Sequence, residues 1–218
     1  MATGQNNNSG KRIAIDFIDP LFAVVISISF FEVMERSWFN PSSISDLSSF
    51  TFNMLTLLLG YFTVVLSWVG YHQSIRSRPI RIETLPGFWR FILDILLLFC
   101  YWILLVKFET FWFVLLTLVI IYWIFVIWDH LKWHEHKDNY SKEEKPTARR
   151  RRGVSTFWAI IITGIFVANW LLIGWCDYIW LTLAFIATIL YRLHKTHLIP
   201  ANILDLLAFS KPERKAHT

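Results

Sequence analysis

Cysteine and glycine are both scarce in this chain, which has only two cysteines, Cys100 and Cys176, and eight glycines among its 218 residues. Two cysteines in or beside apolar segments make neither a disulfide framework nor a metal pair. A phosphate-binding glycine loop is missing, and so is a nucleophile at a sensible spacing from a base. We therefore predict that the chain is not an enzyme and uses no cofactor and no metal ion.

The histidine-rich segment around residue 130 is the one stretch that suggests metal binding. His130 and His134 are four residues apart and could share a helical face, with Asp129 or Glu135 supplying a carboxylate. The order of these residues does not match a His-Glu-x-x-His zinc signature. Anchoring at the membrane interface, or a charge that changes with pH, explains these histidines better.

Long polar stretches are also rare, because 55% of the residues are hydrophobic. A membrane-spanning helix requires about 20 mostly apolar residues. Six segments approach or meet this length, although the last is short: residues 13–34, 50–71, 89–106, 111–127, 154–173 and 178–191. Six spans and their connections leave no room for a sizeable soluble domain.

Basic residues fall almost entirely on one side of these six segments. When the N-terminus is placed in the cytoplasm, the cytoplasmic side receives all of the 21 lysines and arginines except Arg36 and Lys107. Cytoplasmic loops carry such an excess in membrane proteins. We therefore predict an all-α, multi-pass cell-membrane protein with six transmembrane helices and both termini in the cytoplasm. Because the positive charge lies beside the membrane, its expected partner is the lipid bilayer and not nucleic acid.

The segmentation also predicts how the chain is organised. We expect a polar N-terminal tail over residues 1–12, a six-helix transmembrane domain over 13–198 and a cytoplasmic tail over 199–218. Within the transmembrane domain, residues 129–153 are the one substantial polar segment and end in a run of four arginines. Such a charged segment predicts a solvated basic loop, which could dock a cytosolic protein.

The first apolar segment carries ionisable groups that a membrane span normally lacks. Asp16 and Asp19 lie near its start, directly before Pro20. One interpretation is that the two carboxylates cap the start of a helix, where proline is also favoured. The alternative is that one face of this helix lines a water-filled path.

A stripe at helical spacing favours the second interpretation. Pro20, Val24, Ser27 and Phe31 stand at i, i+4, i+7 and i+11, so they share one face of a helix. Bulky apolar side chains can gate a pore by excluding water, and a small hydroxyl can provide a resting position for an ion. The Ser27 hydroxyl could equally bond its own helix backbone.

Two short runs resemble a known family. Residues 16–23, Asp-Phe-Ile-Asp-Pro-Leu-Phe-Ala, are similar to the Phe-Ser-Asp-Gly-x-Phe-Ala motif that opens the first helix of the transmembrane protein 175 family. Trp68 and His72 match that family's Trp-x-x-His-His near the end of its second helix. The family comprises potassium-permeable channels of lysosomes and bacteria.

The resemblance implies a homotetrameric channel for monovalent cations, potassium-like, in which the first helix of each subunit lines the pore. Val24 would form the constriction, and Ser27 and Phe31 would follow along the pore. A polar network would lock the first helix against the second, and its members would be Phe17, Asp19, Trp68 and His72.

Several positions of this chain depart from the family motifs. Ile18 replaces the serine, Pro20 replaces the glycine and Tyr71 replaces the first histidine, while Ile13 stands where the family has an arginine. The resemblance therefore does not assign an ion preference to this chain.

Asp94 is a further candidate because it lies deep in the third apolar segment. The simplest interpretation is a carboxylate that accepts a hydrogen bond from a neighbouring indole or hydroxyl. It could also pair with His72 or Arg90, or carry a proton. Two rival functions therefore stay open: a membrane effector subunit regulated by a partner at the basic loop, and a small proton-coupled transporter that uses Asp94.

Overall fold

The computed structural model describes residues 6–35, 47–142, 144–172 and 177–196, and these ranges are helical apart from short connections. The elements are α1 (Asn6–Glu35), α2 (Leu47–Ser77), α3 (Leu85–Val106), α4 (Phe111–His136), the 3₁₀ turn η3 (Lys137–Asn139), α5 (Glu144–Leu171) and α6 (Asp177–Lys195). No strand occurs within these ranges, so the predicted all-α class is confirmed.

Five of the helices are long and apolar enough to cross a membrane. These spans are Phe17–Glu35, Leu47–Ile75, Leu85–Val106, Phe111–Asn139 and Glu144–Leu171. The sixth helix, α6, has 19 residues and is not among them. The helices are therefore those of a membrane protein, as the composition predicts. The tail expected over 199–218 lies outside the described residues.

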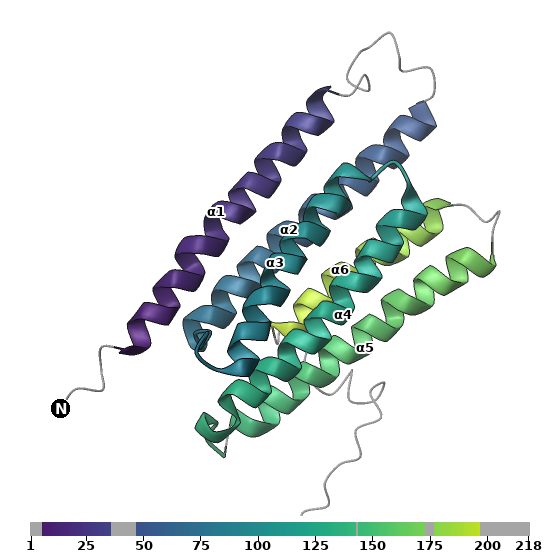
Figure 1. Cartoon of the computed structure of the whole chain (residues 1–218). Coiled ribbons are helices and arrows are strands. Elements are labelled where there is room, and N and C mark those ends of the chain that lie inside the picture. Colours follow the sequence, from purple (N-terminus) through teal and green to yellow (C-terminus); the bar gives the residue numbers. More distant parts are fainter. Residues whose placement is uncertain (1–5, 36–46, 143, 173–176, 197–218) are drawn as a thin grey trace, which may run out of the picture.

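Successive helices run in opposite directions along the bundle. In Figure 1, α1, α3 and α5 begin at the lower end, where α2, α4 and α6 finish. Short connections make this possible: Lys107 N–H donates to Ile103 O (2.9 Å) and Thr110 N–H donates to Lys107 O (3.1 Å) in the turn between α3 and α4. These two bonds make a tight turn that joins α3 and α4 as an antiparallel pair.

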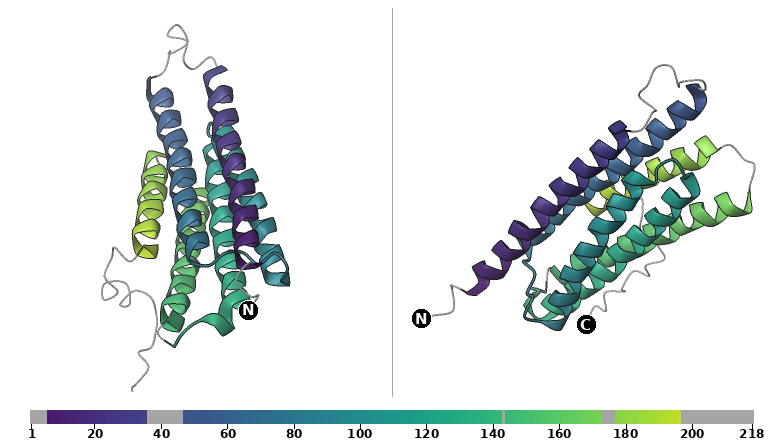
Figure 2. Two further views of the ribbon diagram at one scale, coloured as in Figure 1. Left: turned by 90° about the vertical axis from the view of Figure 1, so that its left-hand side faces the viewer. Right: turned by 45° about the horizontal axis from the view of Figure 1, so that its top comes forward.

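The helix at one edge of the bundle is α1, and α5 lies at the opposite edge (Figures 1 and 2). The central helix is α4, which makes its most extensive contacts with α3 and α5, whereas α1 packs mainly on α3. The contacts of α2 with α3 and α6 are fewer. This looser packing of α2 leaves space inside the bundle, as described below.

The start of α1 differs from the prediction. The helix begins at Asn6, so residues 6–12 of the expected polar tail are helical. Asp19 and Pro20 consequently lie inside the helix, and the interpretation of Asp16 and Asp19 as caps of its start is wrong. The reason is that an apolar run marks the part of a helix that enters the membrane, whereas the helical backbone itself continues into polar residues.

The segment 129–153 is also different from the solvated loop that its charge predicts. Helix α4 continues to His136, and α5 already begins at Glu144, so the arginine run belongs to a helix. Ser141 and Glu144 start this helix reciprocally: Glu144 N–H donates to Ser141 Oγ (3.2 Å), and Ser141 N–H donates to Glu144 Oε2 (2.9 Å). This Ser-x-x-Glu pattern is a capping box, a sequence signal that outweighs the charge of the segment.

Candidate functional site

Three of the four residues of the predicted network meet between α1 and α2. His72 Nε2 lies 2.8 Å from Asp19 Oδ1, and the same oxygen accepts a 3.4 Å hydrogen bond from Trp68 Nε1. The Trp68 and His72 rings are perpendicular, with their centroids 4.8 Å apart. The carboxylate of α1 is therefore held by two side chains that stand one helical turn apart on α2.

Phe17, the fourth residue of that network, packs on α3. Its ring centroid lies 5.6 Å from that of Phe91, and 47% of the residue is exposed. Ile18, which stands where the family motif has a serine, is completely buried. The isoleucine is thus part of the bundle core, so its side chain contributes apolar packing where the family's serine would supply a hydroxyl.

The predicted pore stripe lies on the outer face of α1. Val24 is 47% exposed and Phe31 is 67% exposed, and Ser27 is also exposed between them. The opposite face is buried, with Phe22 and Val33 among its members. The structure thus places the three predicted pore residues together, and their role in conduction stays a prediction.

Asp94 is held inside the bundle by an indole. Its side chain is buried, and Oδ1 accepts a 2.9 Å hydrogen bond from Trp128 Nε1 of α4. This contact agrees with the simpler of the interpretations given above. The second oxygen, Oδ2, has no hydrogen-bond partner among the described residues.

Glu135, considered above as a metal ligand, is bound to an arginine. Its carboxylate pairs with Arg90 of α3, and both side chains are completely buried. The Arg90 guanidinium also lies over the Trp128 ring, 4.4 Å from its centroid. His130 bonds back to the Val126 carbonyl through Nδ1 (2.9 Å). These contacts make the segment a structural junction between α3 and α4.

A second ion pair, between the half-buried Lys195 and the buried Asp129, joins α4 to α6. Lys195 Nζ donates to Asp129 Oδ2 (3.0 Å), to Ser155 Oγ (3.2 Å) and to Tyr191 Oη (2.8 Å). Ser155 Oγ in turn donates to Asp129 Oδ2. The pair is satisfied on both sides, as a buried pair must be in order not to destabilise the fold.

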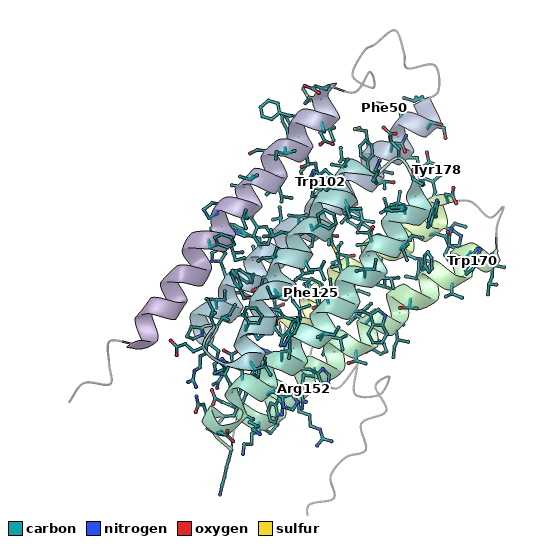
Figure 3. All side chains as sticks on the ribbon, viewed as in Figure 1. Phe50, Trp102, Phe125, Arg152, Trp170 and Tyr178 are labelled. Carbon is teal, nitrogen blue, oxygen red and sulfur yellow. The ribbon has the colours of Figure 1, made fainter. Side chains whose placement is uncertain are left out.

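A cavity of about 560 Å³ lies between α2 and the helices α3 to α6, and Ile18 and Phe22 of α1 also line it. Its deeper part is lined mainly by aromatic and aliphatic side chains, including Phe22, Leu97 and Tyr101. Figure 3 labels two other lining residues, Phe125 at mid-bundle and Arg152 near the lower end of α5. The volume is in the range of sites for small molecules.

Charge accumulates at the lower end of this cavity. Six basic residues line it: Arg78, Lys132, Arg151, Arg152, Arg192 and Lys195. Three acidic residues line it: Asp94, Asp129 and Glu144. Glu144 pairs with Arg78 (2.9 Å) and Asp129 pairs with Lys195, so the carboxylates near this end are already engaged. The cavity therefore carries a surplus of positive charge.

The sequence does not predict this cavity. It places Lys132 and Arg192 among the basic residues of the cytoplasmic side, whereas in the structure they lie on α4 and α6 and line the cavity. One sequence signal could have located them: Lys132 stands four residues after Trp128, and Arg192 directly follows Tyr191. That spacing does not reveal which helix stands opposite.

The chain was compared with known proteins at three levels, and no family model, no curated protein and no solved structure matches it.

Proposed function

We propose that this chain forms an oligomeric, potassium-like cation channel in the cell membrane, with α1 lining the pore and an apolar constriction acting as the gate. The proposal includes six membrane spans with both termini in the cytoplasm, and four copies around a central axis. It extends the resemblance to the transmembrane protein 175 family. The observation that carries it is the exposed stripe Val24, Ser27 and Phe31 on a helix at the edge of the bundle.

Contacts on the other face of α1 support this role because they fix which face is turned outward. Near the middle of the helix, Asp19 is held by His72 and Trp68. Further along, Ser29 lies 3.3 Å from the Tyr61 hydroxyl of α2. A helix held at two levels presents the same stripe along its length, which a pore wall requires.

The chemistry of the stripe suits a gate. Val24 and Phe31 narrow a path with apolar surfaces that exclude water when the path is closed, and the Ser27 hydroxyl between them can replace part of an ion's hydration shell. One copy of α1 cannot enclose a path, so the proposed pore requires further copies of the chain.

The sixth span depends on α6. With 19 residues the helix is about 28 Å long, close to the roughly 30 Å of a bilayer's hydrocarbon core. Figure 2 supports a span, because α6 runs alongside α2 for much of its length. Six spans would bring both termini to the side that holds most of the basic residues.

Current through the purified protein in planar bilayers tests the proposal. We expect cation conductance, and we expect Val24→Ala to increase the unitary conductance by widening the constriction. Val65→Ala is the matched control, because Val65 of α2 has the same 47% exposure as Val24. Absence of conductance, or equal currents in both variants, would contradict the proposal.

The transporter alternative is favoured by one observation, the buried Asp94 that lines the cavity. It predicts solute uptake that Asp94→Asn abolishes and that occurs without unitary conductance. The effector alternative predicts bilayers that stay silent until a cytosolic partner is added. The same preparation therefore separates the three functions.

A further inference from the structure

We propose that the cavity between α2 and the helices α3 to α6 binds one anionic phospholipid, whose phosphate lies between Lys132 and Arg192. Part of an acyl chain would occupy the aromatic and aliphatic region of the cavity, because its volume of about 560 Å³ cannot hold a whole diacyl lipid. This site is separate from the exposed stripe of α1 and does not depend on the channel proposal.

Lys132 is the first reason. Only 7% of this residue is exposed, yet it forms no ion pair among the described residues. Its ammonium group donates to the Ser74 hydroxyl and lies 5.5 Å from the centroid of the Trp128 ring. A buried cation without an anionic partner costs free energy. An anion in the adjacent cavity removes that cost.

Arg192 is the second reason. Its guanidinium reaches from α6 across to α2 and lies against Gly70, where an added Cβ would come within 2.0 Å of Nη1. The glycine thus provides the space in which this guanidinium sits. Nη2 of Arg192 is buried and has no hydrogen-bond partner among the described residues. Guanidinium groups bind phosphate oxygens well through such N–H donors.

The shape of the cavity argues for an amphiphile. Its lining on α2 extends from Thr63 to Ser74, about 16 Å along the helix, and basic groups lie at one end only. Its other walls include apolar and aromatic side chains such as Phe22, Leu97 and Tyr101. A free phosphate or a sugar phosphate would leave this apolar part unfilled.

The position of the basic end of the cavity agrees with a phosphate that belongs to a lipid headgroup. Arg78, Arg151 and Arg152 also line it, next to the connection between α4 and α5. The distribution of lysine and arginine puts this side of the protein in the cytoplasm. The cytoplasmic leaflet supplies anionic lipids, and basic pockets between membrane helices on that side bind their headgroups.

Native mass spectrometry of the detergent-purified full chain tests the site. Phosphatidylglycerol is the anionic probe and phosphatidylcholine the zwitterionic one, while inorganic phosphate and glycerol 3-phosphate represent a soluble source. We expect phosphatidylglycerol to bind with a stoichiometry of one per chain and about tenfold tighter than phosphatidylcholine. Equal binding of the two lipids, or soluble phosphates that displace phosphatidylglycerol, would overturn the lipid assignment.

Variants locate the site. We expect Lys132→Gln/Arg192→Gln to weaken phosphatidylglycerol binding about tenfold or more. Lys142→Gln removes an exposed charge outside the cavity lining and is the control for net charge. Gly70→Ala keeps every charge and displaces the Arg192 guanidinium, so it should also weaken binding. Unchanged binding in both the double variant and Gly70→Ala would place the lipid elsewhere. These readouts need no ion current, so their failure is distinct from failure of the channel proposal.

Discussion

Individual buried charges on α4 are stabilised by different kinds of neighbour. Glu135 faces the Arg90 guanidinium, and Asp129 faces the Lys195 ammonium and the Ser155 hydroxyl. Lys132 has a hydroxyl and an indole ring beside it but no carboxylate in an ion pair within the described part of the chain. Loss of a partner should therefore have different consequences at each of these positions.

Glu135→Gln should lower the free energy of unfolding by about 3–5 kcal/mol, because it leaves the buried Arg90 without its counter-charge. Denaturant unfolding in detergent micelles measures this change. The double variant Arg90→Met/Glu135→Met is the control, and it should retain most of the stability, since no unpaired charge remains. A loss below about 1 kcal/mol for Glu135→Gln would contradict the burial of this pair.

Trp128→Phe should cost about 1–3 kcal/mol, because it removes the N–H that donates to Asp94 and keeps an aromatic ring. A double-mutant cycle in the Asp94→Leu background isolates this hydrogen bond. The same substitution should cost less there, because the acceptor is gone. Equal losses in the two backgrounds would show that ring packing accounts for the whole effect.

At the level of helices, the glycines of α2 and α5 differ in their surroundings: Gly60 of α2 is close to a neighbouring helix, whereas Gly164 of α5 has open space around it. Gly60 of α2 lies against α3, where an added Cβ would be 3.0 Å from Leu105 Cδ2. Gly164 of α5 has no atom within 4 Å of such a Cβ in the described chain. Small residues permit such close approach between membrane helices.

Gly60→Val should destabilise the protein by about 1–3 kcal/mol, because the larger side chain must push α2 away from Leu105. Gly164→Val is the matched control, with the same substitution in the interior of a helix and space around it. Unfolding in detergent measures both. A similar change in the two variants would contradict the close contact between α2 and α3.

The outward face of α1 can be tested by accessibility. In a background with Cys100→Ala and Cys176→Ala, cysteines placed at 24, 27 and 31 should react with water-soluble thiol reagents if α1 lines the proposed pore. Leu58→Cys is the control, since Leu58 of α2 is 53% exposed and its expected surroundings are lipid. Shielding of all three α1 positions to the level of the control would exclude a water-filled path along this helix.

For the whole molecule, the alternation of helix directions brings most of the basic residues to one end of the bundle. The connections that follow α2 and α4 lie at one end of the bundle, and most basic residues of the described chain are at that end or near it (Figures 1 and 3). The turn between α3 and α4 lies at the other end. An excess of lysine and arginine at the first end supports our proposal that this end faces the cytoplasm.

Side-specific labelling of intact cells tests this orientation. In the same cysteine-replaced background, Glu109→Cys should react with a membrane-impermeant reagent added outside, and Lys142→Cys should react only after the membrane is opened. Both positions are exposed, so a failure to react cannot come from burial. The reverse pattern would invert the topology, and labelling of both positions from one side would contradict an odd number of crossings between them.

The helical class and the approximate position of each helix follow from the apolar segments, because a bilayer offers the backbone no hydrogen-bond partners and so favours helices. The helix ends were predicted less well. Asn6 and Glu144 begin α1 and α5 in polar sequence, where hydropathy is uninformative and capping residues decide. The contact of Asp19 with His72 was accessible through the resemblance of two short motifs.

The order and nature of the helices were thus settled by local chain chemistry: apolar length, charge beside the membrane and a few capping residues. The partners of the interior charges were settled by how the helices assemble. Two contacts join residues that are distant along the chain: Arg90 pairs with Glu135, and the Arg192 guanidinium packs against Gly70. Such contacts depend on the rotation and spacing of whole helices, and a loosely packed α2 is what opens the basic cavity.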